Sequence, residues 1–166
     1  GSLSQVQALQ NAAEATVYGI QAGLEVKLPQ GFAFSSDFNY QLGEEEMEDG
    51  STSPSRHAAP MFGSSRLTYQ ANKLKLQFYV LYQAEVSHED LSVSEQGKDE
   101  IYALDEQGNT YAPAWYTINL KAMYSLSEQF SLSAGLENIS DQRYRPYSSG
   151  ISGAGRNFVT SVTAKF

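Results

Sequence analysis

The feature that most restricts the fold of this chain is the recurrence of apolar residues at every second position. Every second residue from Tyr116 to Leu126 is apolar or aromatic, whereas the intervening positions include Thr117, Asn119 and Lys121. A period of two is typical of a β-strand whose two faces meet different surroundings. Seven stretches show this alternation, namely residues 18–28, 32–42, 65–71, 74–85, 115–126, 130–137 and 158–166. The sequence therefore predicts an all-β protein.

The connections between these stretches alternate strictly between short and long. Tight turns are expected at residues 29–31, 71–73 and 127–129, and long connections at residues 43–61, 86–113 and 138–157. The pattern predicts an antiparallel meander with tight turns at one rim and long loops at the other. This arrangement is typical of outer-membrane β-barrels, whose strands of about 9–11 residues cross the bilayer. The strands of a soluble β-sandwich or a lipocalin-like barrel also alternate between apolar and polar residues, but these folds seldom place all short connections at one rim and all long ones at the other.

Composition excludes several classes of protein. The net charge is -8 and the pI is about 4.7, so a nucleic-acid partner is not expected, because a polyanion would be repelled. The chain has no cysteine, which excludes disulfides and thiolate metal sites. No run of about 18 or more apolar residues occurs, which excludes a transmembrane helix but leaves membrane-spanning strands open.

The number of strands indicates a segment of a larger structure. A bacterial outer-membrane barrel has an even number of strands, at least about eight, and begins and ends on the periplasmic side. About seven strands are expected here. The first and last would then be open edges, whose unpaired backbone groups are costly in hydrocarbon. We expect the isolated segment to self-associate through these edges.

Two motifs near the C-terminus carry a family resemblance. Residues 138–144 read N-I-S-D-Q-R-Y and resemble a pattern that ends the penultimate strand of TonB-dependent receptors. Residues 155–158 read G-R-N-F and resemble the motif that opens the final strand of these receptors. Residues 11–19 and 57–63 resemble earlier stretches of the family, so the resemblance spans nearly the whole chain, but only the last thirty or so residues are specific.

The resemblance implies a plugged outer-membrane barrel of about 22 strands. Residues 15–166 would form the C-terminal portion of that barrel, with its last seven strands and three extracellular loops. Residues 1–14, which begin with Gly1 and Ser2, are expected to be a cloning remnant and an extracellular lead-in. The plug domain and the segment that engages TonB are not found in these residues.

The same resemblance implies a function at the bacterial outer membrane. The whole receptor would bind a scarce nutrient such as an iron–siderophore, haem or cobalamin and import it by TonB-coupled active transport. It would not be an enzyme, and no cofactor is expected. The implied partners are the rest of the barrel and the plug, TonB, the barrel assembly machinery, lipid and lipopolysaccharide, and the nutrient chelate. The alternatives are a small structural or adhesion barrel and a soluble β-sandwich binding module.

The last strand carries a further resemblance. It ends in an aromatic residue, as does the C-terminal signal that the assembly machinery reads in outer-membrane proteins. The residues that share this face are Phe158, Val162, Ala164 and Phe166. An edge strand with an aromatic anchor is a plausible template for strand addition.

Candidate ligand contacts lie in the long connections. They are His57, His88, Arg143, Tyr144, Arg145, Tyr147 and Arg156. Guanidinium groups suit anionic carboxylates or phosphates, and tyrosine rings stack on flat ligands. Scaffolding at the strand ends is an equally good interpretation of the arginines. No catalytic motif stands out, and two histidines without cysteine do not predict a metal site. The acidic run at residues 44–49 could hold a divalent cation but is expected to be a solvated loop tip.

Overall fold

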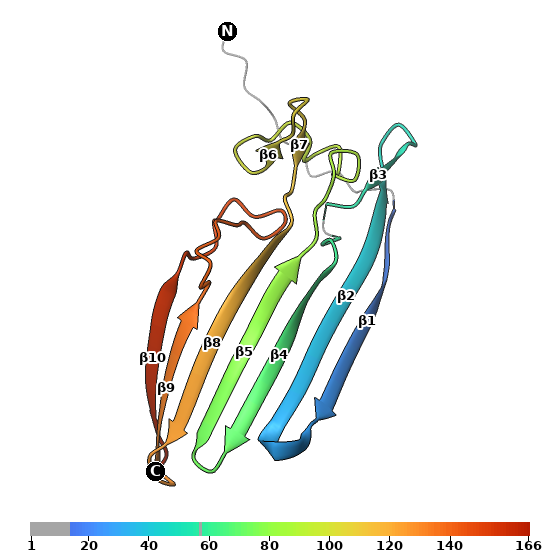
Figure 1. Cartoon of the computed structure of the whole chain (residues 1–166). Coiled ribbons are helices and arrows are strands. Elements are labelled where there is room, and N and C mark those ends of the chain that lie inside the picture. Colours follow the sequence, from blue (N-terminus) through green and yellow to red (C-terminus); the bar gives the residue numbers. More distant parts are fainter. Residues whose placement is uncertain (1–13, 57) are drawn as a thin grey trace.

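The computed structural model describes residues 14–56 and 58–166. One antiparallel sheet contains seven long strands in the order β1-β2-β4-β5-β8-β9-β10 (Figure 1). Their bounds are β1 Ala15–Lys27, β2 Phe32–Glu46, β4 Phe62–Ala71, β5 Leu74–Gln83, β8 Trp115–Ser125, β9 Phe130–Glu137 and β10 Asn157–Ala164. Three short strands lie between them: β3 Thr52–Pro54, β6 Ala103–Leu104 and β7 Thr110–Tyr111. The predicted all-β meander of about seven strands is confirmed.

The short connections are tight, as the sequence predicts. The turn between β1 and β2 is a single 3-10 turn, Pro29–Gly31, in which Gln30 and Gly31 both have positive φ angles of 61° and 85°. A Cβ atom at Gly31 would lie 2.2 Å from the carbonyl oxygen of Gln70, so only glycine fits this close approach. The β4–β5 turn uses Asn72 at a φ of 48°, a conformation that asparagine tolerates well.

The strand register gives the sheet two chemically different faces. Directly paired residues share a face, and one row crosses the whole sheet through Val26, Phe34, Leu67, Phe78, Leu120, Leu136 and Phe158. Large apolar side chains on this face stay exposed, including Ile20 at 67% and Val162 at 69%. Exposed apolar surface on this scale requires a non-aqueous partner. We call it the outer face.

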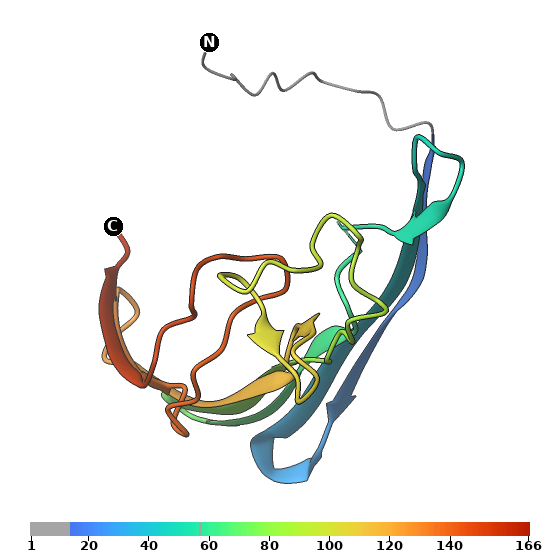
Figure 2. The ribbon, with the colours of Figure 1, turned by 90° about the horizontal axis from the view of Figure 1, so that it is seen from above.

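The opposite face is polar and lies on the inside of the curved sheet. Thr117 and Asn119 are only 2% and 3% exposed, and Arg66 lies over the ring of Tyr79 at 5.4 Å from its centroid. Seen from above, the sheet bends into an arc and the long connections fold over its concave side (Figure 2). One of them reaches the inner-face residue Gln83, whose Oε1 accepts a hydrogen bond from the backbone N–H of Tyr147. We call this concave side the inner face.

The end of β2 differs from the prediction. The strand was expected to end at residue 42, but it continues to Glu46, and Glu44, Glu45 and Glu46 pair with the three residues of β3. Only the tip, around Asp49, is a turn. The three consecutive glutamates did not indicate a strand, because a β-ribbon that projects into water needs no apolar face and so leaves no alternating pattern.

The hydrophobic core of the described residues lies above the sheet rather than against it. Its buried members are Val86, Leu91, Tyr102 and Ala112, all from the connection between β5 and β8. Between residues 14 and 166, residue 57 aside, no helix is long and apolar enough to cross a membrane.

Candidate functional site

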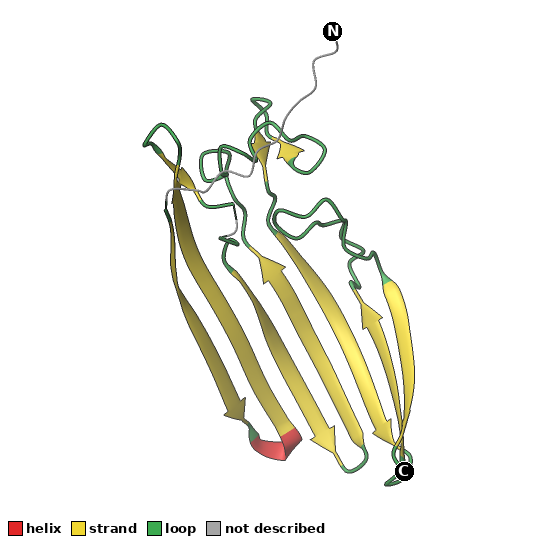
Figure 3. Cartoon of the chain, turned by 180° about the vertical axis from the view of Figure 1, so that it is seen from behind, coloured by secondary structure: helices red, strands yellow, loops and turns green. Residues whose placement is uncertain are grey.

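Three long connections gather at one rim of the sheet, opposite the tight turns (Figures 1 and 3). We call residues 47–61 loop A, residues 84–114 loop B and residues 138–156 loop C. This segregation confirms the alternation of short and long connections expected from the sequence. Every candidate ligand contact that the structure describes lies in loops B and C or, for Arg156, at the end of loop C.

Loop B is an ordered unit. Val86 and Ala112 exchange two backbone hydrogen bonds at its base, and the β6–β7 ribbon forms its tip. In that tip the Asp105 carboxylate accepts hydrogen bonds from the backbone N–H groups of Asn109 and Gln107, at 2.8 and 2.9 Å. The Asn109 bond is the main reason why the pKa of Asp105 lies below its ordinary value.

A buried carboxylate joins loops A and B. Glu95 is 1% exposed and accepts hydrogen bonds from Lys98 at 2.7 Å and from the Tyr102 hydroxyl at 2.8 Å. Arg56 of loop A lies 3.1 Å from the same carboxylate. Burial raises the pKa of Glu95, but these hydrogen bonds and positive charges outweigh it and hold the pKa below the ordinary value. We call this group, made of Arg56, Glu95, Lys98 and Tyr102, the Glu95 clasp.

Loop C is held by the first of the two C-terminal motifs. Asn138 is 2% exposed with a φ of 48°. Its Nδ2 donates to the carbonyl oxygens of Gln142 and Ala154 at 2.8 and 3.0 Å, and its Oδ1 accepts from the Gln142 N–H at 3.0 Å. Its own N–H donates to Asn119 Oδ1 on β8. Asn138 therefore closes loop C on itself and ties it to the sheet.

The second motif is bonded directly to the first. The backbone N–H of Arg156 donates to the Asp141 carboxylate at 2.7 Å. The Arg156 Nε donates to the carbonyl oxygen of Ile139 at 2.9 Å. Residues far apart in loop C thus meet at the point where β9 ends and β10 begins, and both motifs act as scaffolding.

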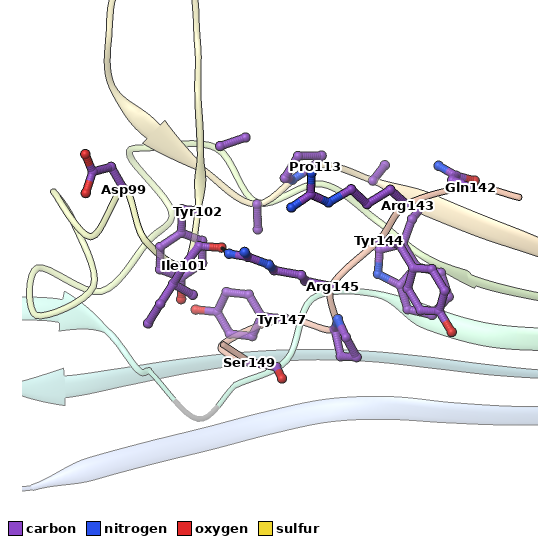
Figure 4. Close-up of a pocket in the computed structure, with 15 residues that line it drawn as sticks. Asp99, Ile101, Tyr102, Pro113, Gln142, Arg143, Tyr144, Arg145, Tyr147 and Ser149 are labelled. Atoms are coloured by element: carbon purple, nitrogen blue, oxygen red, sulfur yellow. Dashed lines mark hydrogen bonds between the residues drawn. The ribbon is translucent and has the colours of Figure 1, made fainter. Parts of the chain in front are cut away.

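A cavity of about 430 Å³ opens between loops B and C (Figure 4). One wall is aromatic, because the rings of Trp115 and Tyr144 lie with their centroids 4.3 Å apart. The Tyr144 ring also presses against Gly153, where a Cβ atom would lie 2.2 Å from the ring. Loop C also supplies Arg143, Arg145 and Tyr147 to the lining, together with Gln142, Pro146 and Ser149. We call this space the loop B–C cavity.

The candidate contacts have different roles in this arrangement. Arg143 is exposed, and within the described residues it has no ion-pair partner. Arg145 also lines the cavity, but its guanidinium donates to the carbonyl oxygens of Glu100 and Ile101 at 2.7 and 2.8 Å. Tyr147 packs against the loop B core, with its ring 6.4 Å from that of Tyr102.

The two histidines do not meet at this cavity. His88 lies in loop B, and its Nδ1 is 3.0 Å from the carbonyl oxygen of Thr110. His57 lies outside the described residues. Within the described part of the chain, no group of acidic, histidine or cysteine side chains is arranged to hold a metal ion.

The expected assembly signal lies on the outer face of the last strand. Phe158 and Val162 are 70% and 69% exposed and pair with Leu136 and Leu132 of β9. Ala164 pairs with Phe130 on the same face. Phe166 follows the strand and is fully exposed. Its role in assembly stays a prediction.

Sequence reasoning missed the importance of Trp115. Its position at the first residue of β8 fits the strand pattern and gives no sign of a cavity wall. The one available signal is that Trp115 is the only tryptophan in the chain and directly follows a long connection.

Comparisons with known proteins show that the chain is similar to segments of outer-membrane receptors and transporters. No protein-family model matches it. The chain is 29% identical over 172 aligned positions to the ferric enterobactin receptor of Pseudomonas aeruginosa, across 95% of this chain and 22% of that receptor. It is similar in structure to the copper transporter OprC, with a TM-score of 0.73, 19% identity, and coverage of 92% of this chain and 24% of the transporter.

A third similarity is to the ferripyoverdine receptor of the outer membrane of Pseudomonas aeruginosa, with a TM-score of 0.60 and 17% identity. It covers 92% of this chain and 20% of that receptor. The chain thus spans less than a quarter of the length of each of these proteins. The predicted resemblance to a segment of a TonB-dependent outer-membrane receptor is confirmed, as is the fold. The matched proteins are receptors and transporters rather than enzymes. This agrees with the prediction of a non-enzymatic protein of the bacterial outer membrane.

Proposed function

We propose that this chain is the C-terminal part of the barrel of a receptor that imports a scarce nutrient across the outer membrane by TonB-coupled active transport. Loops A, B and C would form part of the extracellular mouth. The sheet would be completed into a barrel by strands that precede it in the whole receptor, which would also contain the plug and the segment that engages TonB.

The observation that carries this proposal is the division of the sheet into an apolar outer face and a polar inner face. The outer face carries no charged side chain along the row from Val26 to Phe158. Such a surface is stable against hydrocarbon, whereas the inner face suits water or a polar domain. The similarity over 95% of the chain to a ferric enterobactin receptor supports the same conclusion.

We propose a metal chelate as the cargo, in the class of iron–siderophores, haem or cobalamin. The relatives support this class through their names, which refer to ferric enterobactin, ferripyoverdine and copper. The remaining partners follow from the location. They are the barrel assembly machinery, which would act on the strand that ends near Phe166, and the lipid and lipopolysaccharide that surround the outer face.

Uptake measurements test the proposal. A strain that lacks the receptor gene would be offered a panel of radioactive iron chelates, haem and labelled cobalamin under nutrient limitation. We expect the strain to lose uptake of one cargo, and the intact gene to restore it only in cells that have TonB and a proton gradient. Uptake that persists without TonB, or that never depends on this gene, would contradict the proposal.

A further inference from the structure

We infer that loops A, B and C open and close as one cooperative unit with loop B at its centre, and not as three independent loops. The inference concerns the coupling between the loops and goes beyond the proposed function, because it holds for any cargo. Three kinds of contact support it: bonds between loops A and B, bonds between loops B and C, and a core that loops B and C share.

Loop A is bonded to loop B at two buried points. The guanidinium of Arg56 lies 3.1 Å from the carboxylate of Glu95. The hydroxyl of Ser53 accepts a hydrogen bond from the backbone N–H of Val93 at 3.1 Å. Ser53 and Glu95 are only 2% and 1% exposed. A movement of loop A alone would take a positive charge away from the carboxylate and an acceptor away from the Val93 amide, and both losses are unfavourable.

Loop C is bonded to the backbone of loop B. The Nη1 of Arg145 donates to the carbonyl oxygens of Glu100 and Ile101 at 2.7 and 2.8 Å. The same turn of loop B is closed by the backbone N–H of Tyr102, which donates to the carbonyl oxygen of Lys98 at 3.0 Å. Lys98 and Tyr102 also belong to the Glu95 clasp. The turn that holds loop A therefore also presents the acceptors that hold loop C.

The shared core connects the two junctions. Tyr147 of loop C packs against the buried core of loop B, and its ring lies 6.4 Å from the ring of Tyr102. The hydroxyl of Tyr102 in turn donates to Glu95 at 2.8 Å. Separation of loop C would uncover this core and free the Tyr102 ring to move away from the clasp. Contacts that depend on one another in this way open together.

The unit covers a defined part of the molecule. Its three loops fold over the concave side of the sheet (Figure 2), so cooperative opening would uncover that part of the inner face in one step. The β6–β7 tip lies outside the unit. It is held by bonds within itself, since Asp105 accepts hydrogen bonds from the N–H groups of Gln107 and Asn109. The tip can therefore open alone.

Hydrogen exchange in the intact receptor in detergent tests the coupling. Exchange is measured by mass spectrometry at single amides, under conditions in which its rate reports the free energy of opening. The reporters are the amides of Ser55 in loop A, Tyr102 in loop B and Gly153 in loop C. Each of them donates to a backbone carbonyl oxygen, at 2.7 to 3.0 Å.

Two variants cut the unit from opposite sides. Arg145→Gln removes the bonds between loops B and C, and we expect exchange to become about tenfold faster at all three reporters, including Ser55 in loop A. Ser53→Ala removes one bond between loops A and B, and we expect exchange about fivefold faster at all three, including Gly153 in loop C. Arg145→Lys keeps a donor and should give a smaller increase than Arg145→Gln.

Two further variants are controls. Arg143→Gln makes the same chemical change two residues away, at an arginine without an ion-pair partner among the described residues, and should leave all three reporters unchanged. Asp105→Ala should speed exchange at Asn109 alone, which shows that a local opening is detected as local. Unchanged exchange along β5 and β8 would show that each variant keeps the sheet.

Three results would overturn the inference. They are faster exchange in Arg145→Gln without any change at Ser55, faster exchange in Ser53→Ala without any change at Gly153, and no change at any reporter in either variant. The outcome is independent of the uptake assay. Coupled loops in a receptor that imports no nutrient would leave this inference standing and refute the proposed function. Import by a receptor whose loops open separately would do the reverse.

Discussion

At the scale of single residues, buried polar side chains hold the loop rim together. Asn138 and Glu95 each connect segments that are distant in the sequence, and each is almost inaccessible to solvent. The sequence motif that contains Asn138 could be recognised, but its structural role could not, because the acceptors of its amide are backbone carbonyls. The burial of Glu95 could not be predicted, since this residue lies in a charged and aperiodic stretch that is typical of a solvated loop.

Removing the amide of Asn138 should release loop C. Asn138→Ala loses three side-chain hydrogen bonds and places alanine at a positive φ. We expect it to destabilise the loop by about 2–4 kcal/mol, at roughly 1 kcal/mol per bond plus the backbone strain. Faster hydrogen exchange at the Gln142 amide would report this loss. Asn138→Gly loses the same hydrogen bonds but tolerates the positive φ, so it should cost less than Asn138→Ala. Unchanged exchange in both variants would contradict the role given to Asn138.

The Glu95 clasp should open at low pH. The pKa of the Glu95 carboxyl lies below the ordinary value for glutamate, which is about 4.3. The stabilisation by the ionised carboxylate is therefore complete above about pH 4.3, and it is lost as the pH falls through the lower pKa of the folded protein. The chain has no cysteine, so a spin label attached through Val93→Cys reports on loop B alone in a receptor free of other cysteines. We expect the label to become mobile only below about pH 4.

The Glu95→Gln variant is the control for this titration. It should make the label mobile at neutral pH as well, because Arg56 and Lys98 lose their common partner. Glu106→Gln, at the exposed tip of the β6–β7 ribbon, should behave as the wild type. A label whose mobility is the same at all pH values in all three proteins would show that the clasp does not hold the loop.

At the scale of elements, the strands were predictable and the loops were not. The alternation of residues 115–126 reflects the two faces of β8 directly, because each side chain meets either the outer or the inner surroundings. Loop B folds through a small core and a buried carboxylate, which leave no periodic signal. The loop B–C cavity was predicted only in part. Arg143 and Tyr144 were named, but Trp115 on the facing strand was not.

Two neighbouring positions on β1 test the assignment of the faces. Ile20 lies on the outer face and Gln21 on the inner face, and both are exposed in this sheet. Ile20→Lys should cost about 2–4 kcal/mol in a membrane and lower the amount of folded receptor in the outer membrane, whereas Gln21→Lys should cost little. The amounts can be compared on immunoblots of unheated samples. Equal tolerance of both substitutions would point to a sheet in water.

At the scale of the whole molecule, the exposed apolar face and the free edges of β1 and β10 determine how the chain associates in solution. Among the described residues, neither β1 nor β10 has a neighbouring strand at its free edge. Such edges pair readily with other strands. We expect this chain, in buffer without detergent, to show a mass by light scattering well above its monomer mass of 18.3 kDa. A compact monomer would instead favour the soluble β-sandwich.

The central claim is that the outer face of the sheet lies against lipid and the inner face does not. Its most direct test is a nitroxide scan along β8, from Tyr116 to Tyr124, in the intact receptor reconstituted into bilayers after removal of other cysteines. We predict that even-numbered positions are accessible to oxygen dissolved in the lipid and that odd-numbered positions are not, with the opposite phase for a water-soluble nickel complex. Accessibility without a period of two, or access of the nickel complex to both faces, would contradict the account.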